Sequence, residues 1–236
     1  MPIKTRIRWI PLLATCLVIV IGVSMGQWQT RRANEKEIIE QKLSDRALAP
    51  ALLLGQEKIA IDDIEYRKLL VRGEFDVRWP LYLENRPHDG AAGFHVLMPF
   101  KIAGSNAYVL VARGWAPRVT ADRTQLPKFA SPTGSVEIQG VAVSKVGHVM
   151  QLGQAPAIQP NAILQNLEIQ QFAAASKLPM HDFLLEQTSD THDGLVRDWP
   201  RPSSGIAKHR GYAFQWYGLA LTALIFFVVT GFRSGK

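Results

Sequence analysis

Two uncharged apolar stretches lie near the ends of this 236-residue chain, from Trp9 to Trp28 and from Gly211 to Phe232. Each has the roughly 20 residues that a helix needs to cross a bilayer, at about 1.5 Å of rise per residue. Two such spans return both ends of the chain to one side of the membrane and place residues 29–210 on the other. The sequence therefore predicts a membrane hairpin that carries one water-exposed domain.

The formal net charge of +7 is concentrated at the two ends of the chain. Residues 29–210 contain all 20 acidic residues and 22 of the 27 lysines and arginines, and the other five are Lys4, Arg6, Arg8, Arg233 and Lys236. Acid-free basic tails are typical of the cytoplasmic side, while long loops cross the membrane largely regardless of their charge. We therefore expect cytoplasmic tails, a periplasmic domain, and the lipid bilayer rather than nucleic acid as a partner.

The first apolar stretch could also be a cleaved signal peptide or the lipid-attachment segment of a lipoprotein. A cleaved signal peptide has a shorter apolar region, and no A-x-A site follows this one. Lipid attachment at Cys16 is conceivable, but apolar residues continue beyond it, so we expect an uncleaved anchor. Only eight residues precede the stretch, which leaves no room for a mitochondrial transit peptide and favours a bacterial inner membrane. Cys16 is the only cysteine, so the domain can form no internal disulfide.

The pattern of residue types divides the chain into seven parts. Residues 29–49 are highly charged and free of Gly and Pro up to the helix-breaking Pro50, so the first helix should continue past the membrane. The expected order is a cytoplasmic tail (1–8), a first transmembrane helix (9–28), a periplasmic helical extension (29–49), a β-rich periplasmic domain (50–189), a strap returning to the membrane (190–210), a second transmembrane helix (211–232) and a cytoplasmic tail (233–236).

The domain is expected to be an α+β fold dominated by short antiparallel strands that curl into a barrel. Segments rich in β-branched and aromatic residues alternate with turn residues, and closing the sheet hides its edges. Residues 103–106 read as a hairpin turn, and residues 164–175 as a helix. The predicted strands are Leu69–Phe75, Pro80–Glu84, Phe94–Ile102, Tyr108–Trp115, Val136–Val143 and Asp182–Leu185.

Catalytic motifs are absent from the sequence. It has no G-x-S-x-G elbow, Walker loop, H-E-x-x-H motif or dinucleotide fingerprint, so we expect no enzyme activity. His88, His95, His148, His181 and His192 show no metal-ligand spacing and read as surface or core histidines. Asp190 and Asp193 could cap or orient the strap.

The stretch around His209 is the exception. His209 lies at the periplasmic mouth of the second span beside Arg210, and Tyr212 and Trp216 follow one turn apart. A belt of aromatic and cationic membrane anchors explains this composition, and composition alone favours that explanation. The alternative is a haem site, in which the imidazole ligates iron, Arg210 pairs with a propionate and the aromatic rings pack on the macrocycle.

A set of motifs in a fixed order resembles a known family. The motifs are Gly73-Glu74-Phe75-Asp76, Asn85-Arg86, Gly93-Phe94-His95-Val96, Arg113-Gly114-Trp115, and His209 with Tyr212 and Trp216. Together with the two-span layout, they closely resemble the surfeit-locus family of cytochrome oxidase assembly proteins. Ala112 stands where that family commonly has Asn.

The resemblance implies a factor that helps deliver haem a to the catalytic subunit of a haem-copper (cytochrome c) oxidase, alongside other assembly factors. His209 is then the candidate iron ligand. Gly73, Phe75, Asp76, Asn85, Arg86, Arg113, Gly114 and Trp115 belong to motifs with a structural role.

Two of these structural roles can be specified further. Arg113 could pair with an acid such as Asp76 or make a cation–π contact. Gly73 and Gly114 could adopt positive φ or permit close backbone approach.

Two other functions remain open at this stage. A scaffold could stabilise oxidase intermediates without touching haem, and a membrane-bound periplasmic enzyme is less well supported.

Overall fold

The computed structural model describes residues 5–57, 59–119, 122, 124–151, 153–199 and 205–234. Residues 200–204 of the expected strap, and parts of both expected tails, lie outside this description. The chain divides into two compact units. A helical unit combines the first helix up to Ser44 with the last helix, and a barrel unit begins at Asp45.

The first helix, α1 (Trp9–Leu48), runs without a break through the predicted span and the predicted extension. Its 40 residues correspond to about 60 Å, twice the roughly 30 Å hydrocarbon core of a bilayer. Pro50 follows two residues after the helix ends, where its ring would clash with a helical backbone. Length and composition alone make α1 a candidate membrane span.

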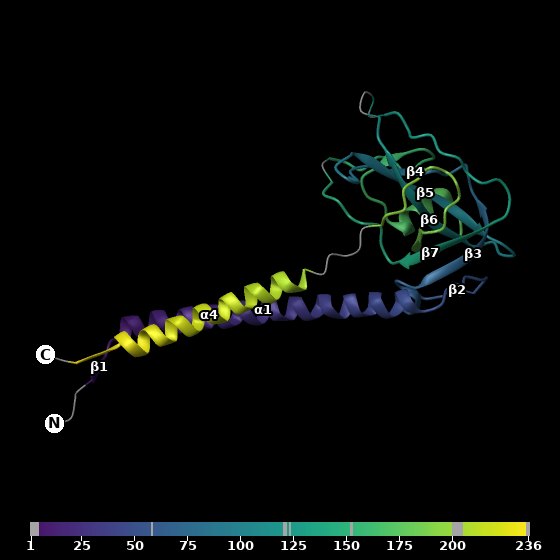
Figure 1. The fold of residues 1–236 in the computed structure, drawn as a ribbon. Helices are drawn as coiled ribbons and strands as arrows, with labels where there is room; N and C mark the ends of the chain where they lie inside the picture. The colour runs from purple at the N-terminus through teal and green to yellow at the C-terminus, as the bar shows by residue number, and fades with distance from the viewer. Residues whose placement is uncertain are drawn as a thin grey trace. The chain divides into compact units, whose positions relative to one another are not determined.

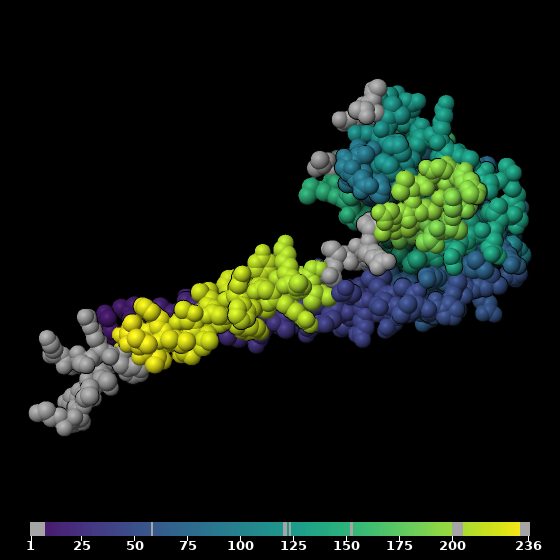
Figure 2. All heavy atoms as spheres, viewed as in Figure 1, coloured from purple at the N-terminus to yellow at the C-terminus, as the bar shows by residue number. Residues whose placement is uncertain are grey.

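The last helix, α4 (Ile206–Thr230), is the second candidate span. It begins five residues before Gly211, so Lys208, His209 and Arg210 form its first turns rather than part of an extended strap. Short strands β1 (Thr5–Ile7) and β10 (Phe232–Ser234) pair antiparallel, which joins the start of α1 to the end of α4. The two helices are therefore antiparallel and lie side by side in both views (Figures 1 and 2).

Small residues allow α1 and α4 to approach closely. A Cβ added at Gly26 would lie 2.5 Å from the Tyr217 ring, and one at Gly22 would lie 3.0 Å from the Ala220 Cβ. Ala33 on α1 and Ala213 on α4 are also buried. This G-x-x-x-G spacing is typical of helix pairs in membranes, where van der Waals packing replaces the hydrophobic effect.

Five strands of the barrel unit close on themselves. They are β3 (Lys68–Phe75), β7 (Val136–Val143), β9 (Met180–Gln187), β6 (Tyr108–Pro117) and β5 (Gly93–Ile102), paired in that order. The circle closes where β3 pairs with β5, from Gly73 opposite Ile102 to Phe75 opposite Phe100 (Figure 1). The barrel prediction is confirmed, and so is the β5–β6 hairpin around Gly104.

The expectation of an antiparallel sheet is only partly confirmed, because three strand pairs are parallel. β6 pairs parallel to β9, β2 (Leu52–Leu53) pairs parallel to β3, and β4 (Leu81–Leu83) pairs parallel to β8 (Ile163–Leu164). Parallel neighbours need a long crossover, and for β6 and β9 it is the chain between them, which includes β7. Sequence alternation gives strand positions but not which distant strand each one meets.

The expected helix over residues 164–175 is also corrected. Residues 163–164 form β8, and the helix α3 (Ile169–Ser176) begins five residues later. The Leu164 carbonyl accepts a hydrogen bond from the Glu84 N–H, so its backbone belongs to the sheet. Leu164, Leu167 and Phe172 nevertheless pack in one cluster on the outer face of the barrel. A further short helix, α2 (Ile61–Ile64), precedes β3.

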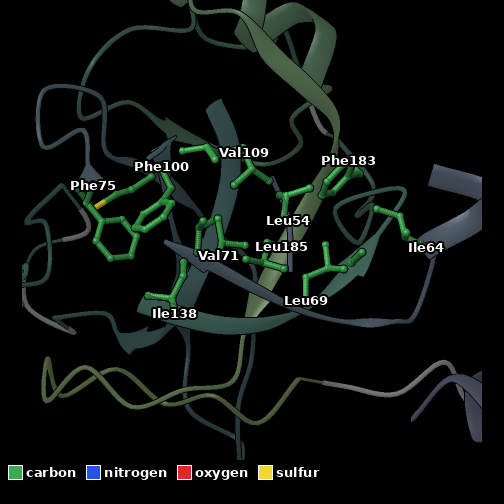
Figure 3. Packing of buried hydrophobic residues seen from close by; sticks show 14 residues of the cluster. Leu54, Ile64, Leu69, Val71, Phe75, Phe100, Val109, Ile138, Phe183 and Leu185 are labelled. Atoms are coloured by element: carbon green, nitrogen blue, oxygen red, sulfur yellow. The ribbon is translucent and has the colours of Figure 1, made fainter. Parts of the chain in front are cut away.

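Alternate residues of the barrel strands fill its interior. Figure 3 shows this core, with Phe75 and Phe100 at one end and Phe183 and Ile64 at the other. The Phe75 and Phe100 rings meet edge to face, with their centroids 4.8 Å apart. The six strands expected from the sequence are all present, with no end shifted by more than two residues and with Val136–Val143 matched at both ends.

Candidate functional site

The seam between α1 and α4 holds His209 in a defined position. The His209 Nδ1 atom lies 2.7 Å from the Oε1 atom of Gln29 on α1. The His209 side chain is half-buried, which follows from its place in the first turns of α4 facing α1. One ring nitrogen is thus engaged by the neighbouring helix.

The other predicted residues around His209 have different surroundings. Arg210 is exposed and donates from Nη2 to both carboxylate oxygens of Glu37, at 3.0 and 2.8 Å. Tyr212 is 43% exposed and Trp216 is half-buried. Arg210 is therefore held by α1 through an exposed ion pair, which contributes little stability but orients the guanidinium. Tyr212 and Trp216 offer aromatic surface along the same helix.

Arg113 closes the barrel at the end occupied by Phe75. It is the extra residue of a β-bulge in β6, because Gly114 pairs with Val96 and Ala112 pairs with Leu97. A bulge re-aims the side chain that it carries. The guanidinium lies 4.3 Å from the centre of the Phe75 ring, a cation–π contact.

The acid that pairs with Arg113 is Asp193, not Asp76. Arg113 Nη2 donates to Asp193 Oδ2 at 2.6 Å, and neither side chain is exposed. Arg197 Nη2 donates to the same oxygen at 2.6 Å. Asp76 instead receives two hydrogen bonds from the exposed Arg78, which lower the pKa of its carboxyl.

Asp193 is the centre of this buried network. Burial by itself would raise the pKa of its carboxyl, but hydrogen bonds from Arg197, the Leu195 N–H and Thr191, with the charge of Arg197, lower it overall. The expectation that Asp193 orients the segment after β9 is thus given a mechanism. The carboxylate ties the segment to Arg113 on β6.

Trp115 and Arg86 form a second structural cluster. Trp115 Nε1 donates to the Arg86 carbonyl at 2.6 Å. The buried Arg86 guanidinium donates to the carbonyls of Gly147 and Gln165, at 2.5 and 3.0 Å. Asn85 precedes it with φ of +57°, a conformation that Asn tolerates better than most residues. This motif therefore joins three loops.

The two motif glycines act by permitting close approach. A Cβ at Gly73 would collide with the Lys101 carbonyl oxygen, where β3 meets β5 and closes the barrel. Gly114 has φ of +153°, and its Cβ would lie 2.7 Å from the Leu195 Cβ and 2.8 Å from the Val196 carbonyl oxygen. At both positions a side chain would collide with neighbouring atoms.

Two titratable groups on the barrel have strongly shifted pKa values. Burial raises the pKa of the Glu186 carboxyl to about 7. Burial lowers the pKa of the His95 imidazole to about 4, and the charges of Arg86 and His88 add to the effect. The His95 ring meets Trp199 edge to face at 5.1 Å. Such packing is typical of a structural histidine.

Among the described residues, no group of three or more His, Cys, Asp or Glu side chains could hold a metal ion.

Comparison with known proteins decides the family. The sequence profile of the SURF1 family matches residues 16–221. The chain belongs to the SURF1 family. This span contains α1 almost completely, the whole barrel unit and the first two-thirds of α4, so the match covers both units.

Named relatives of the chain support this assignment. A SURF1-like protein of Rickettsia felis is 26% identical over 224 residues, which is 92% of this chain and 95% of that protein. Surfeit locus protein 1 of Xenopus tropicalis is 28% identical over 152 residues, 58% of this chain and 48% of that protein. The human protein of the same name is 28% identical over 127 residues, 48% of this chain and 41% of that protein.

The motifs of this SURF1-family chain are divided between the two units. His209, Arg210, Tyr212 and Trp216 belong to the helical unit, and the motif residues from Gly73 to Trp115 belong to the barrel unit. Sequence reasoning missed Gln29, Glu37 and Arg197 as partners. Gln29 could have been noticed from the sequence, because it is an uncharged polar residue directly after the apolar stretch.

Proposed function

We propose that this chain is an assembly factor for a haem-copper (cytochrome c) oxidase, and that it holds haem a through His209 during delivery to the catalytic subunit. Membership of the SURF1 family supports the assembly role. The observation that carries the haem role is the placement of His209 at the helix seam, with one nitrogen engaged by Gln29. The other five histidines all belong to the barrel unit.

A single protein ligand suits a carrier. Resident haem proteins often hold iron from both faces, as when His and Met ligate it together, whereas a delivery factor must release its cargo. Arg210 adds a cation that could pair with a propionate, although it must then share its charge with Glu37. Tyr212 and Trp216 supply aromatic surface for the macrocycle.

The proposed location is a bacterial inner membrane, with the barrel unit in the periplasm and both termini in the cytoplasm. The antiparallel arrangement of α1 and α4 supports this, because it places both chain ends at the same end of the helical unit. The apolar residues of both helices are largely exposed and need a cover, and lipid is the cover that their length fits. The oxidase and its other assembly factors are the proposed protein partners.

Two alternatives compete with this proposal. A scaffold would support oxidase assembly without binding haem, and a periplasmic enzyme would convert a substrate. The difference between carrier and scaffold lies in His209, since only a carrier needs that imidazole.

The test uses full-length protein purified from cells that make haem a, with His209→Ala as the variant. The wild type should carry haem pigment, and the variant should lose most of it while accumulating normally. His192→Ala is the matched control, because the His192 side chain is 93% exposed and contacts the exposed Asp190. His88 is a poorer control, since its ring packs 5.1 Å from Trp115.

The same strains report on assembly. Oxidase haem a content should fall in a deletion strain and in the His209→Ala strain. Normal oxidase in the deletion strain would refute the assembly role. If His209→Ala loses no pigment while the deletion impairs the oxidase, the scaffold function is favoured.

A further inference from the structure

We propose that Gln29 is a positioning residue that fixes the tautomer and ring orientation of His209, so that the Nε2 atom is the one that binds iron. The inference rests on the proposed function and adds to it a second residue, on the other helix. Nothing in the order of motifs along the chain pointed to Gln29, which lies 180 residues from His209.

The orientation of the Gln29 amide sets the tautomer of His209. The Gln29 atom that faces His209 is Oε1, a carbonyl oxygen that can only accept a hydrogen bond. With the amide in this orientation, the 2.7 Å contact is a hydrogen bond in which Nδ1 carries the proton and donates it. In a neutral imidazole the lone pair then lies on Nε2, which is the form that can ligate a metal through that atom.

The surrounding helix pair holds Gln29 in place. Its neighbour Gly26 packs on the Tyr217 ring, and Ala33 is 1% exposed on the same helix. The Thr30 hydroxyl donates a hydrogen bond to the Gly26 carbonyl at 2.9 Å. The backbone of α1 is therefore close to α4 on both sides of Gln29, which limits how far the amide can move from His209.

This arrangement follows a general rule for metal-binding histidines. The nitrogen that does not bind the metal usually donates to an oxygen, and that oxygen sets the ring orientation and raises the basicity of the ligand. Removing such a partner typically costs about 10- to 100-fold in metal affinity. Arg210 does not compete for the same oxygen, because its guanidinium donates to Glu37.

The experiment compares Gln29→Leu and Gln29→Glu in the full-length protein in detergent. Leucine keeps the approximate size of the side chain but cannot accept a hydrogen bond, whereas a carboxylate can only accept. Gln27→Leu is the matched control, because Gln27 is exposed on the same helix. Equal thermal unfolding of the two leucine variants would show that the helix pair is retained.

The first measurement needs no haem. Nitrogen NMR of protein labelled at histidine distinguishes a protonated Nδ1 from a protonated Nε2, and the signals missing in His209→Ala identify those of His209. We expect the wild type and Gln29→Glu to show the proton on Nδ1, and Gln29→Leu to show a mixture of tautomers. A single unchanged tautomer in Gln29→Leu would overturn the inference.

The second measurement is titration with haem a, followed by its absorption spectrum. Gln29→Leu should weaken binding about 10-fold or more, and Gln29→Glu should restore most of the affinity. If His209→Ala loses haem but Gln29→Leu does not, Gln29 has no positioning role and the proposed function survives. If His209→Ala binds haem like the wild type, the ligand role itself fails, and this inference fails with it.

Discussion

At the scale of single residues, the barrel unit depends on a carboxylate that is buried between two arginines. Asp193 has no exposed side-chain surface and accepts from Arg113 and Arg197 at 2.6 Å each. Thr191 adds a third hydrogen bond at 2.8 Å. Two cations and one anion leave a net positive charge in this cluster. Removing the Asp193 charge would leave both arginines without this counter-ion.

Asp193→Asn should therefore destabilise the protein by about 3–5 kcal/mol, because it leaves Arg113 charged and buried without its counter-ion. Chemical denaturation followed by far-UV circular dichroism would measure the loss. Asp190→Asn is the matched control. The Asp190 side chain is 66% exposed, and its ion pair with Arg197 is long at 3.5 Å, so its loss should cost less than about 1 kcal/mol.

The pH dependence of this contribution has a defined sign. The folded state lowers the pKa of Asp193 below its ordinary value of about 3.9. Its stabilisation is therefore complete above about pH 4 and decreases as the pH falls through the folded-state pKa. Equal loss of stability in acid by the wild type and Asp193→Asn would contradict this assignment.

Glu186 should give the stability of the protein the opposite dependence on pH. Burial raises the pKa of its carboxyl to about 7, above the ordinary value of about 4.3. The folded state holds a proton between these values, so stability is complete below about pH 4 and decreases as the pH rises to about 7. Glu186→Gln removes this titration. The variant should have a higher melting temperature than the wild type at about pH 8 and a smaller advantage at about pH 5. No change in that difference between the two pH values would argue against a protonated, half-buried Glu186.

At the scale of elements, the helix pair depends on two positions of α1 that have no side chain. Gly22 and Gly26 stand one turn apart and let α4 approach its backbone. The polar contacts of the seam, from Gln29 to Glu37, continue along α1 beyond these glycines. Close packing near the glycines and hydrogen bonds beyond them thus belong to one interface.

Gly26→Leu should separate or distort this interface, because its Cβ already falls 2.5 Å from the Tyr217 ring. Overpacking of this kind typically costs about 1–3 kcal/mol. Thermal unfolding in detergent would measure the effect. The control is Gly218→Leu on α4, where an added Cβ meets nothing within 4 Å. If both substitutions lower the melting temperature equally, the close packing at Gly26 does not stabilise the pair.

At the scale of the whole molecule, the antiparallel helices and the β1–β10 pairing place both ends of the chain together. α1 is longer than a bilayer is thick, so its charged second half has to leave the hydrocarbon region. The acid-free basic tails are the basis for the proposed cytoplasmic location of both ends.

A reporter that is active only in the cytoplasm tests this topology. Fused after Lys236 it should be active, and inserted at Gly104 it should be silent. Gly104 is suitable because it lies in the exposed β5–β6 turn with φ of +70°. The reverse pattern would place the barrel unit in the cytoplasm.

Features that depend on neighbouring residues could be predicted from the sequence. The length of α1, the presence of α4, the positions of the main strands and the β5–β6 turn all follow from local periodicity and composition. His209 was also found this way, because a histidine at the end of an apolar run is visible without knowing the fold. The start of α3 was misplaced, since the backbone of residues 163–164 is used by a distant strand.

The pairing of residues far apart in the chain could be seen only in the folded structure. Arg113 pairs with Asp193, 80 residues away, rather than with Asp76, because a bulge in β6 directs its side chain to the segment that follows β9. Gln29 meets His209 because glycines on α1 bring two helices from opposite ends of the chain into contact. Such pairings depend on packing and strand order, and neither leaves a periodic signal in the sequence around the residue concerned.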